Sequence, residues 1–129
     1  MLVREFNPHS DYAMLVDWWT RRDFPPVHLH SLPPTGIVVE RDGLPVCAGF
    51  LYKPENIAWA EWIVSNPDAD SDTRHYGLDL LMSMLHSVAK NFGYRVVFTS
   101  SNNAEWMERL KKHGYLVGDT SVTQLFKPL

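Results

Sequence analysis

The sequence is poor in cysteine: Cys47 is the only one among 129 residues, so no disulfide can form within the chain. A lone cysteine fits a reducing compartment, and we expect Cys47 to be a small residue of the core. No apolar run approaches the length of a membrane-spanning helix, and residues 1–5 lack the apolar segment of a signal peptide. These absences predict a soluble, cytoplasmic protein without a membrane partner.

Concentrated positive charge is missing as well. The chain has 12 Lys and Arg residues against 15 Asp and Glu, a formal net charge of −3, and its basic residues are spread along the sequence. Proteins that bind nucleic acids gather their basic residues on one surface or segment. We therefore expect no nucleic-acid partner.

A convincing set of metal ligands is also absent. His28 and His30 alternate in an extended segment, which places both side chains on one side of the chain. No cysteine or third histidine lies nearby, and Asp23 is the only close carboxylate. Structural metal sites need more ligands than this, so ordinary loop histidines are the preferred interpretation and no metal is expected.

What the sequence does contain is the composition of one globular domain over residues 1–129, with 45% hydrophobic and 21% charged residues. Apolar periodicity and turn signals such as Asp42-Gly43 divide it into strands and helices. Ser10 is the expected N-cap of the first helix. The expected order is strand 2–6, helix 11–21, an irregular proline-rich segment 23–34, strands 35–40, 45–52 and 57–64, helix 78–92, strand 94–99, helix 103–113 and strand 122–126.

The strand 57–64 and the helix 78–92 form the centre of this arrangement. The strand is apolar on both faces except at Glu61, as expected in the middle of a sheet. Turn-forming residues follow, and Arg74-His75-Tyr76-Gly77 stands at the predicted helix start. Backbone N–H groups of a first helical turn bind anions, so this start is a candidate phosphate site. An ordinary loop with a solvated arginine is the alternative.

The same region resembles the signature of the GNAT superfamily of N-acetyltransferases. In that family the pattern is an Arg or Gln, two residues, Gly, one residue and then Gly or Ala, and its backbone amides hold the pyrophosphate of acetyl-CoA. Asp79 stands here in place of the second small residue, and the turn before Arg74 is longer than usual. The matching residues are Val64 and Pro67, then Arg74-x-x-Gly77-x-Asp79 and the apolar pair Leu81-Met82.

The resemblance implies a fold of the α/β (α+β) class: a single-domain GNAT-like fold with a mixed, mostly antiparallel sheet and flanking helices. Strands 57–64 and 94–99 would form its central parallel strand-helix-strand unit, with a right-handed crossover. They would splay apart at their C-terminal ends, which frees backbone for the pantetheine arm of acetyl-CoA. Leu32-Pro33-Pro34-Thr35-Gly36 and residues 61–67 also resemble small GNAT-type proteins of phages and bacteria.

The resemblance further implies which residues contact acetyl-CoA, the expected cosubstrate. Asn103 together with Lys112-x-Gly114-Tyr115 resembles a second family segment, in which a tyrosine often reprotonates the leaving thiolate. Leu110 occupies the place of that tyrosine and cannot donate a proton. The expected cofactor-binding residues are Arg74, His75, Tyr76, Gly77 and Leu78 around the pyrophosphate, the backbone of Ile63 and Val64 along the pantetheine, and Asn103 near its far end.

Glu61 is the candidate catalytic base. Its apolar neighbours in the strand would raise its pKa toward a useful value, and the family often carries a glutamate here that acts directly or through water. The alternative is a glutamate that is paired with an arginine or exposed on the sheet. Strict alternation places Trp59 on the face of Glu61 and Trp62 on the other; one of them could line an acceptor pocket, although large aromatics in a central strand are more often core.

The expected activity is transfer of an acetyl group from acetyl-CoA to an unidentified small-molecule or peptide amine, with a homodimer left open. One alternative is a non-catalytic GNAT-fold module that binds CoA or another protein, which Asp79 and Leu110 favour. A second alternative is an unrelated small α/β protein that acts through a tryptophan-rich partner surface.

Overall fold

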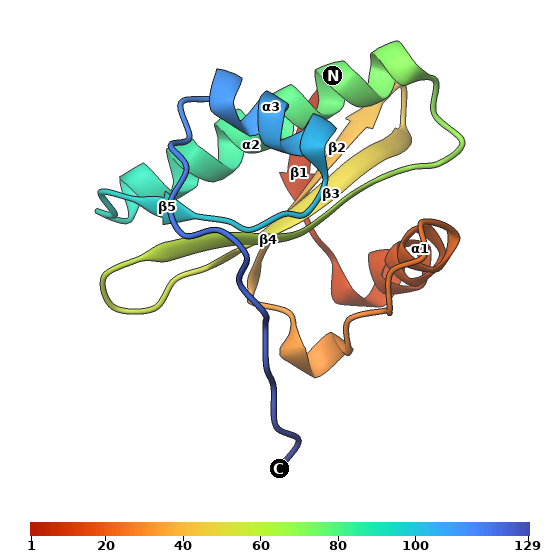
Figure 1. The fold of residues 1–129 in the computed structure, drawn as a ribbon. Helices are drawn as coiled ribbons and strands as arrows, with labels where there is room; N and C mark the ends of the chain where they lie inside the picture. Colours follow the sequence, from red (N-terminus) through yellow and green to blue (C-terminus); the bar gives the residue numbers. More distant parts are fainter.

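A five-stranded sheet organises the protein, and the computed structural model describes all residues from 1 to 129. The strands lie in the order β1-β2-β3-β4-β5 with helices packed around them, as predicted for an α/β fold (Figure 1). The elements are β1 (Leu2–Glu5), α1 (Pro8–Arg21), the short 3-10 helix η1 (Leu29–Ser31), β2 (Thr35–Arg41), β3 (Leu44–Tyr52), β4 (Ala58–Ser65), α2 (Ser71–Asn91), β5 (Val97–Phe98) and α3 (Ala104–Lys112).

Strand pairing follows the expected topology. The strands β1 to β4 pair antiparallel with their sequence neighbours, and α2 then crosses to β5, which pairs parallel to β4. The hairpin between β2 and β3 turns at Asp42 and Gly43, whose φ angles are +51° and +78°. Two positive φ angles fit the two-residue turn whose twist matches that of the strands. The antiparallel strands and the central parallel unit are both confirmed.

The sheet buries a hydrophobic core on each face. The helices α2 and α3 cover one face, where Cys47 and Leu81 are fully buried (Figure 1). The helix α1 covers the other face and packs Trp18 and Trp19 in a cluster with Phe50. Cys47 is therefore a core residue, as predicted. No helix is both long enough and apolar enough to cross a bilayer.

The helix α1 begins earlier than predicted. Asn7 is its N-cap instead of Ser10, because the Asn7 side chain accepts the backbone N–H groups of His9 and Ser10 at 2.9 and 3.3 Å. Pro8 occupies the first helical position, where a missing N–H removes no helical hydrogen bond. The sequence prediction chose Ser10 as the cap and overlooked the Asn7-Pro8 pair before it.

The helix α2 begins at Ser71, not at Leu78. Asp70 caps it: one carboxylate oxygen accepts the backbone N–H of Thr73 at 2.9 Å and the other accepts its hydroxyl at 2.8 Å. The predicted turn was wrong because Asp and Ser favour helix caps and first helical turns as much as they favour loops. The helix gains about two turns as a result.

The predicted strand 122–126 does not form, and β5 is much shorter than the expected 94–99. Two residues present too little edge for a further strand to pair with. Leu125 and Phe126 are each 90% exposed, so the apolar side chains that favoured a strand find nothing to pack against. Figure 1 shows the chain after α3 running away from the sheet to the C-terminus.

Candidate functional site

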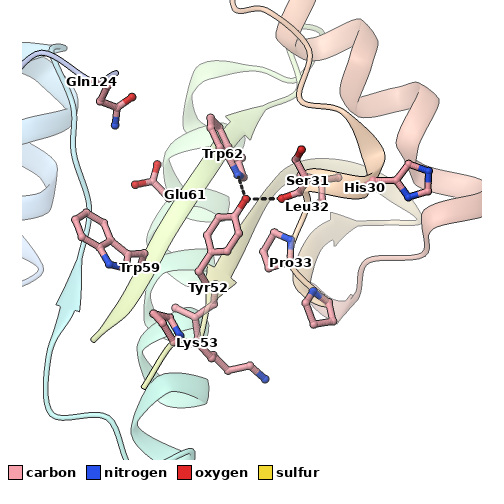
Figure 2. A pocket seen from close by; sticks show the side chains of 13 residues that line it. His30, Ser31, Leu32, Pro33, Tyr52, Lys53, Trp59, Glu61, Trp62 and Gln124 are labelled. Carbon is pink, nitrogen blue, oxygen red and sulfur yellow. Dashed lines mark hydrogen bonds between the residues drawn. The ribbon is translucent and has the colours of Figure 1, made fainter. Parts of the chain in front are cut away.

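A pocket of about 810 Å³ opens between η1 and β4 (Figure 2). Its walls come from the η1 segment and the prolines after it, from the end of β3 with the following loop, and from β4, with one residue of the C-terminal segment at one side. A volume of this order holds a small organic molecule. The lining residues are His30, Ser31, Leu32, Pro33, Pro34, Leu51, Tyr52, Lys53, Pro54, Trp59, Glu61, Trp62 and Gln124.

The strand β4 contains a bulge at this pocket. Ala48 of β3 pairs with Val64, and Phe50 pairs with Glu61, so one residue of β3 faces two residues of β4. One of the two, Trp62, has a φ of +58°, which is a genuine outlier for a bulky side chain. A bulge of this kind interrupts the alternation of the strand and re-aims a side chain.

The bulge brings Trp62 to the same pocket as Trp59 and Glu61. The prediction that Trp62 lies on the opposite face was wrong, because alternation with a period of two assumes an uninterrupted strand. Trp59 does share the Glu61 face, as predicted. Three side chains from four consecutive residues of β4 therefore line one pocket (Figure 2).

The Glu61 carboxyl is the unusual ionisable group of the pocket. Burial raises its pKa to about 7, the direction expected from its apolar surroundings. No hydrogen bond or neighbouring charge contributes to this shift, so the alternative of a glutamate paired with an arginine is wrong. A carboxyl that exchanges its proton near neutral pH has the property needed of a general acid or base.

Tyr52 holds the walls of the pocket together. Its hydroxyl donates to the backbone carbonyl of Ser31 at 2.6 Å and accepts from the indole Nε1 of Trp62 at 2.8 Å (Figure 2). These bonds join η1, the end of β3 and the bulge. Sequence reasoning missed Tyr52, although its antiparallel pairing with Trp59 across a short loop is a signal that could have found it.

The strands β4 and β5 separate after a short parallel contact. Only Ala58 and Trp59 of β4 pair with β5, whereas β4 continues to Ser65. Past these pairs the hydroxyl of Thr99 donates to the carbonyl of Ala60 at 2.8 Å. The later part of β4 therefore has no strand partner on that side, which agrees with the predicted splay.

Ile63 and Val64 lie in this unpaired part of β4. Their side chains enter opposite cores, since Ile63 packs on the α2 side of the sheet and Val64 on the α1 side. Val64 pairs with Ala48 of β3, whereas Ile63 lies in the bulge, so of the two backbones that the sequence interpretation assigned to the ligand only that of Ile63 has no partner in β3. Their contact with pantetheine stays a prediction.

The residues predicted to hold pyrophosphate lie inside α2. From the fifth residue of a helix onward, each backbone N–H donates to the carbonyl four residues earlier, so the N–H groups of His75, Tyr76, Gly77 and Leu78 are engaged within the helix. Gly77 packs closely on β3: a Cβ added there would lie 2.7 Å from Cγ1 of Val46. The contact of these residues with acetyl-CoA stays a prediction, and it would have to use side chains, which Gly77 does not have.

The first turn of α2 keeps two backbone donors free. Arg74 donates its N–H to the Asp70 carbonyl at 3.0 Å and Thr73 donates to the Asp70 side chain, whereas the N–H groups of Ser71 and Asp72 have no partner within the protein. The carboxylates of Asp70 and Asp72 stand beside these donors. The helix start therefore offers two hydrogen-bond donors to an anion, but the two carboxylates beside them would repel it.

Solved structures of acetyltransferases share this architecture. A Mycobacterium tuberculosis protein in complex with CoA superposes with a TM-score of 0.74 over 95% of this chain and 76% of its own, at 19% identity. Glucosamine-6-phosphate N-acetyltransferase from Arabidopsis thaliana gives 0.69 over 98% of both chains, at 14% identity. A predicted acetyltransferase from Clostridium acetobutylicum, solved with acetyl-CoA, gives 0.67 over 96% of this chain and 95% of its own, at 12% identity. The chain has the GNAT fold.

The chain therefore does not have another α/β fold, whereas action through a tryptophan-rich partner surface stays a prediction. No protein-family model matches the sequence, and no curated protein matches it either. The likeness to the solved structures is therefore one of backbone arrangement, and the activity of this chain has to be argued from its own residues.

Asp79, which departs from the GNAT signature, points toward α3. Its Oδ1 accepts from the Arg109 guanidinium at 2.8 Å and lies 2.9 Å from Nε2 of His113. Burial alone would raise the pKa of Asp79, but these two hydrogen bonds hold it below its usual value. The charge of Asp79 is thus compensated on the side of α2 that faces α3.

Two further family positions serve the structure of α3 in this GNAT fold. Asn103 is the N-cap and accepts the backbone N–H of Trp106 at 2.8 Å. Leu110 is 5% exposed and belongs to the core beneath α2 and α3. Leu110 therefore has a packing role, while the predicted contact of Asn103 with acetyl-CoA stays a prediction.

Proposed function

We propose that this protein is an acyl-CoA-dependent N-acetyltransferase that moves an acetyl group from acetyl-CoA to an amine. The observation that carries the proposal is Glu61: an unpaired, partly buried carboxyl with a pKa of about 7 in a pocket of small-molecule size. The fold supports it, because solved structures with the same fold hold CoA or acetyl-CoA.

Glu61 is the proposed catalytic base. The amine nitrogen forms a bond to the acetyl carbon, the bond from that carbon to sulfur breaks, and the proton lost by the amine passes to Glu61. CoA leaves as a thiolate that takes a proton from water, since Leu110 offers none. Near neutral pH about half of the Glu61 side chains are ionised and ready to accept a proton.

The candidate binding residues suit the pantetheine arm of acetyl-CoA better than its pyrophosphate. The backbone of Ile63, which has no strand partner, suits the pantetheine arm, which bonds to a strand as another strand does. Val64, whose backbone pairs with Ala48 of β3, is proposed to lie beside the same arm. The free N–H groups of Ser71 and Asp72 suit the pyrophosphate, and the side chains of Arg74, His75, Tyr76, Leu78 and Asn103 are proposed to surround the nucleotide. Gly77 has no side chain and is proposed to contribute only by letting α2 pack closely on β3. The carboxylates of Asp70 and Asp72 reduce the affinity for that dianion.

Two measurements test the proposal in sequence. CoA should raise the melting temperature of the protein, because a ligand that binds only the folded state stabilises it. Acetyl-CoA should then release free thiol in the presence of a panel of primary amines and not in their absence. A protein that neither binds CoA nor releases thiol with any amine would exclude the transferase.

A non-catalytic GNAT module that binds CoA or another protein is the second candidate. The buried Leu110 in the place of a proton donor and the acidic cap of α2 favour it. CoA binding without turnover would support this candidate against the enzyme. Origin in a phage and a homodimeric state stay predictions from the sequence.

A further inference from the structure

The ionisable side chains of the pocket lie apart from one another. Besides Tyr52, its ionisable lining residues are Glu61, Lys53 and His30. The ammonium of Lys53 lies 3.8 Å from the ring centroid of Phe92, away from Glu61, and the His30 ring stacks on His28 beyond Leu32, at the far end from Glu61 (Figure 2). The carboxyl of Glu61 therefore has no cationic neighbour in the pocket.

Aromatic rings surround that carboxyl. Figure 2 shows Glu61 with Trp59 on one side and with Trp62 and Tyr52 on the other. The Tyr52 hydroxyl and the Trp62 indole N–H are already hydrogen-bonded to each other, and Tyr52 also donates to the η1 backbone. Trp59 is held in place by Phe98 of β5, with 5.1 Å between the ring centroids. The Tyr52 hydroxyl proton and the Trp62 N–H are thus used within the protein, and neither is left to donate to an anion.

We propose that this pocket selects a primary amine carried on an apolar or aromatic body, with no carboxylate or phosphate near the nitrogen. Trp59, Trp62 and Tyr52 attract the ammonium form through their ring faces, and the Glu61 carboxylate pairs with it. That this amine accepts the acetyl group rests on the proposed function. Binding of the amine in the pocket does not depend on that function.

The same arrangement disfavours zwitterions and phosphorylated amines. A carboxylate or phosphate near the amine would enter a partly desolvated space beside the Glu61 carboxylate, which would repel it, while the Lys53 ammonium lies over the Phe92 ring. Amino acids and amino-sugar phosphates should therefore be poor ligands compared with a plain amine of the same size.

Three matched probes test the selection by calorimetry without CoA. Phenethylamine has the proposed features, 2-phenylethanol replaces the ammonium by a neutral hydroxyl, and phenylalanine adds a carboxylate beside the amine. We expect phenethylamine to bind at least about tenfold more tightly than either of the others at pH 8, where Glu61 is mostly ionised. Equal affinities, or tighter binding of phenylalanine, would overturn the proposal.

Variants locate the effect. Glu61→Gln should remove the preference for phenethylamine over 2-phenylethanol, and Trp59→Leu should weaken phenethylamine about five- to twentyfold through the lost ring. Phe24→Leu is the control, because Phe24 is an exposed aromatic residue outside the pocket. Losses of the same size in the Phe24 variant, or an unchanged preference in Glu61→Gln, would count against the pocket.

A transfer assay separates this inference from the proposed function. Phenethylamine that binds with the expected preference, in a protein that neither binds CoA nor releases thiol with any amine of the panel, would exclude the transferase and leave the amine site. Acetylation of phenylalanine at least as efficient as that of phenethylamine would keep the transferase and overturn the selection.

Discussion

Two parts of the central β4–α2 unit, the middle of β4 and the start of α2, are built differently. At Glu61 the strand bulges, Trp62 adopts a left-handed backbone and a carboxyl is held without a partner. At the start of α2, hydrogen bonds within the chain are already made: Asp70 caps the helix, and two N–H groups of the first turn are bonded. Strain and an unpaired charge are stored at the pocket, and local interactions are completed at the helix start.

This difference indicates where function is concentrated. Strain and unpaired charge persist only where the surrounding structure enforces them, so we infer that the pocket is the part of the molecule arranged for a ligand. The start of α2 instead resembles any well-capped helix, although two of its donors remain free. We therefore expect changes at Glu61 to alter chemistry and changes around Asp70 and Gly77 to alter stability or cosubstrate affinity.

The largest effect is expected from Glu61→Gln on acetyl transfer. Loss of a general base should lower turnover about 10²- to 10⁴-fold at pH 7 while CoA affinity is retained and the melting temperature is not lowered. Turnover should partly recover at higher pH, where more of the amine arrives deprotonated. The same change at the exposed Glu108, which pairs with Lys111, is the control. If Glu61→Gln turns over as fast as the parent, or if its low turnover comes with a lowered CoA affinity, Glu61 is not the catalytic base.

Gly77→Ala should lower the stability of the fold. The added Cβ would lie 2.7 Å from the buried Val46 side chain, so we expect a loss of about 1–3 kcal/mol in the free energy of unfolding. Gly118→Ala is the control, since nothing lies within 4 Å of its Cβ position. Denaturant titration measures both. If Gly77→Ala is as stable as the parent, α2 does not pack on β3 in this way.

This packing changes how Gly77→Asp can be used. The sequence interpretation expects that variant to weaken CoA binding about tenfold or more through bulk and charge. Loss of binding in an unfolded variant would say nothing about the site, so CoA affinity should be compared only in variants whose denaturation midpoint is retained.

The pH dependence of stability tests the buried state of Glu61. Its pKa is raised from 4.5 to about 7 on folding, so the unfolded chain ionises first as the pH rises. The parent should lose stability between about pH 4.5 and pH 7 relative to Glu61→Gln, which cannot ionise. Allowing for partial exposure, the difference should reach about 1–2 kcal/mol by pH 8. A constant difference from pH 4 to pH 8 would contradict the raised pKa.

The smallest effect concerns the helix start. Asp70→Asn keeps a capping side chain and removes one negative charge, so CoA should bind about three- to tenfold more tightly if its pyrophosphate lies there. Glu105→Gln removes a charge from the first turn of α3 and serves as the control. Calorimetry that shows no gain for Asp70→Asn would place the pyrophosphate elsewhere.

The sequence by itself determined the order of elements up to α3, the parallel crossover and the isolation of Glu61 within an apolar strand, because periodicity and turn chemistry are local properties. Tertiary structure decided the rest. The bulge at Trp62 depends on how β3 and β4 align, the pocket wall at Tyr52 depends on contacts between distant segments, and the missing last strand depends on the length of edge that β5 offers. The start of α2 depends on both sequence and tertiary structure. Asp70 and Ser71 favour turns and helix caps alike. The helix forms here with its early residues, including Gly77 on Val46, packed against β3.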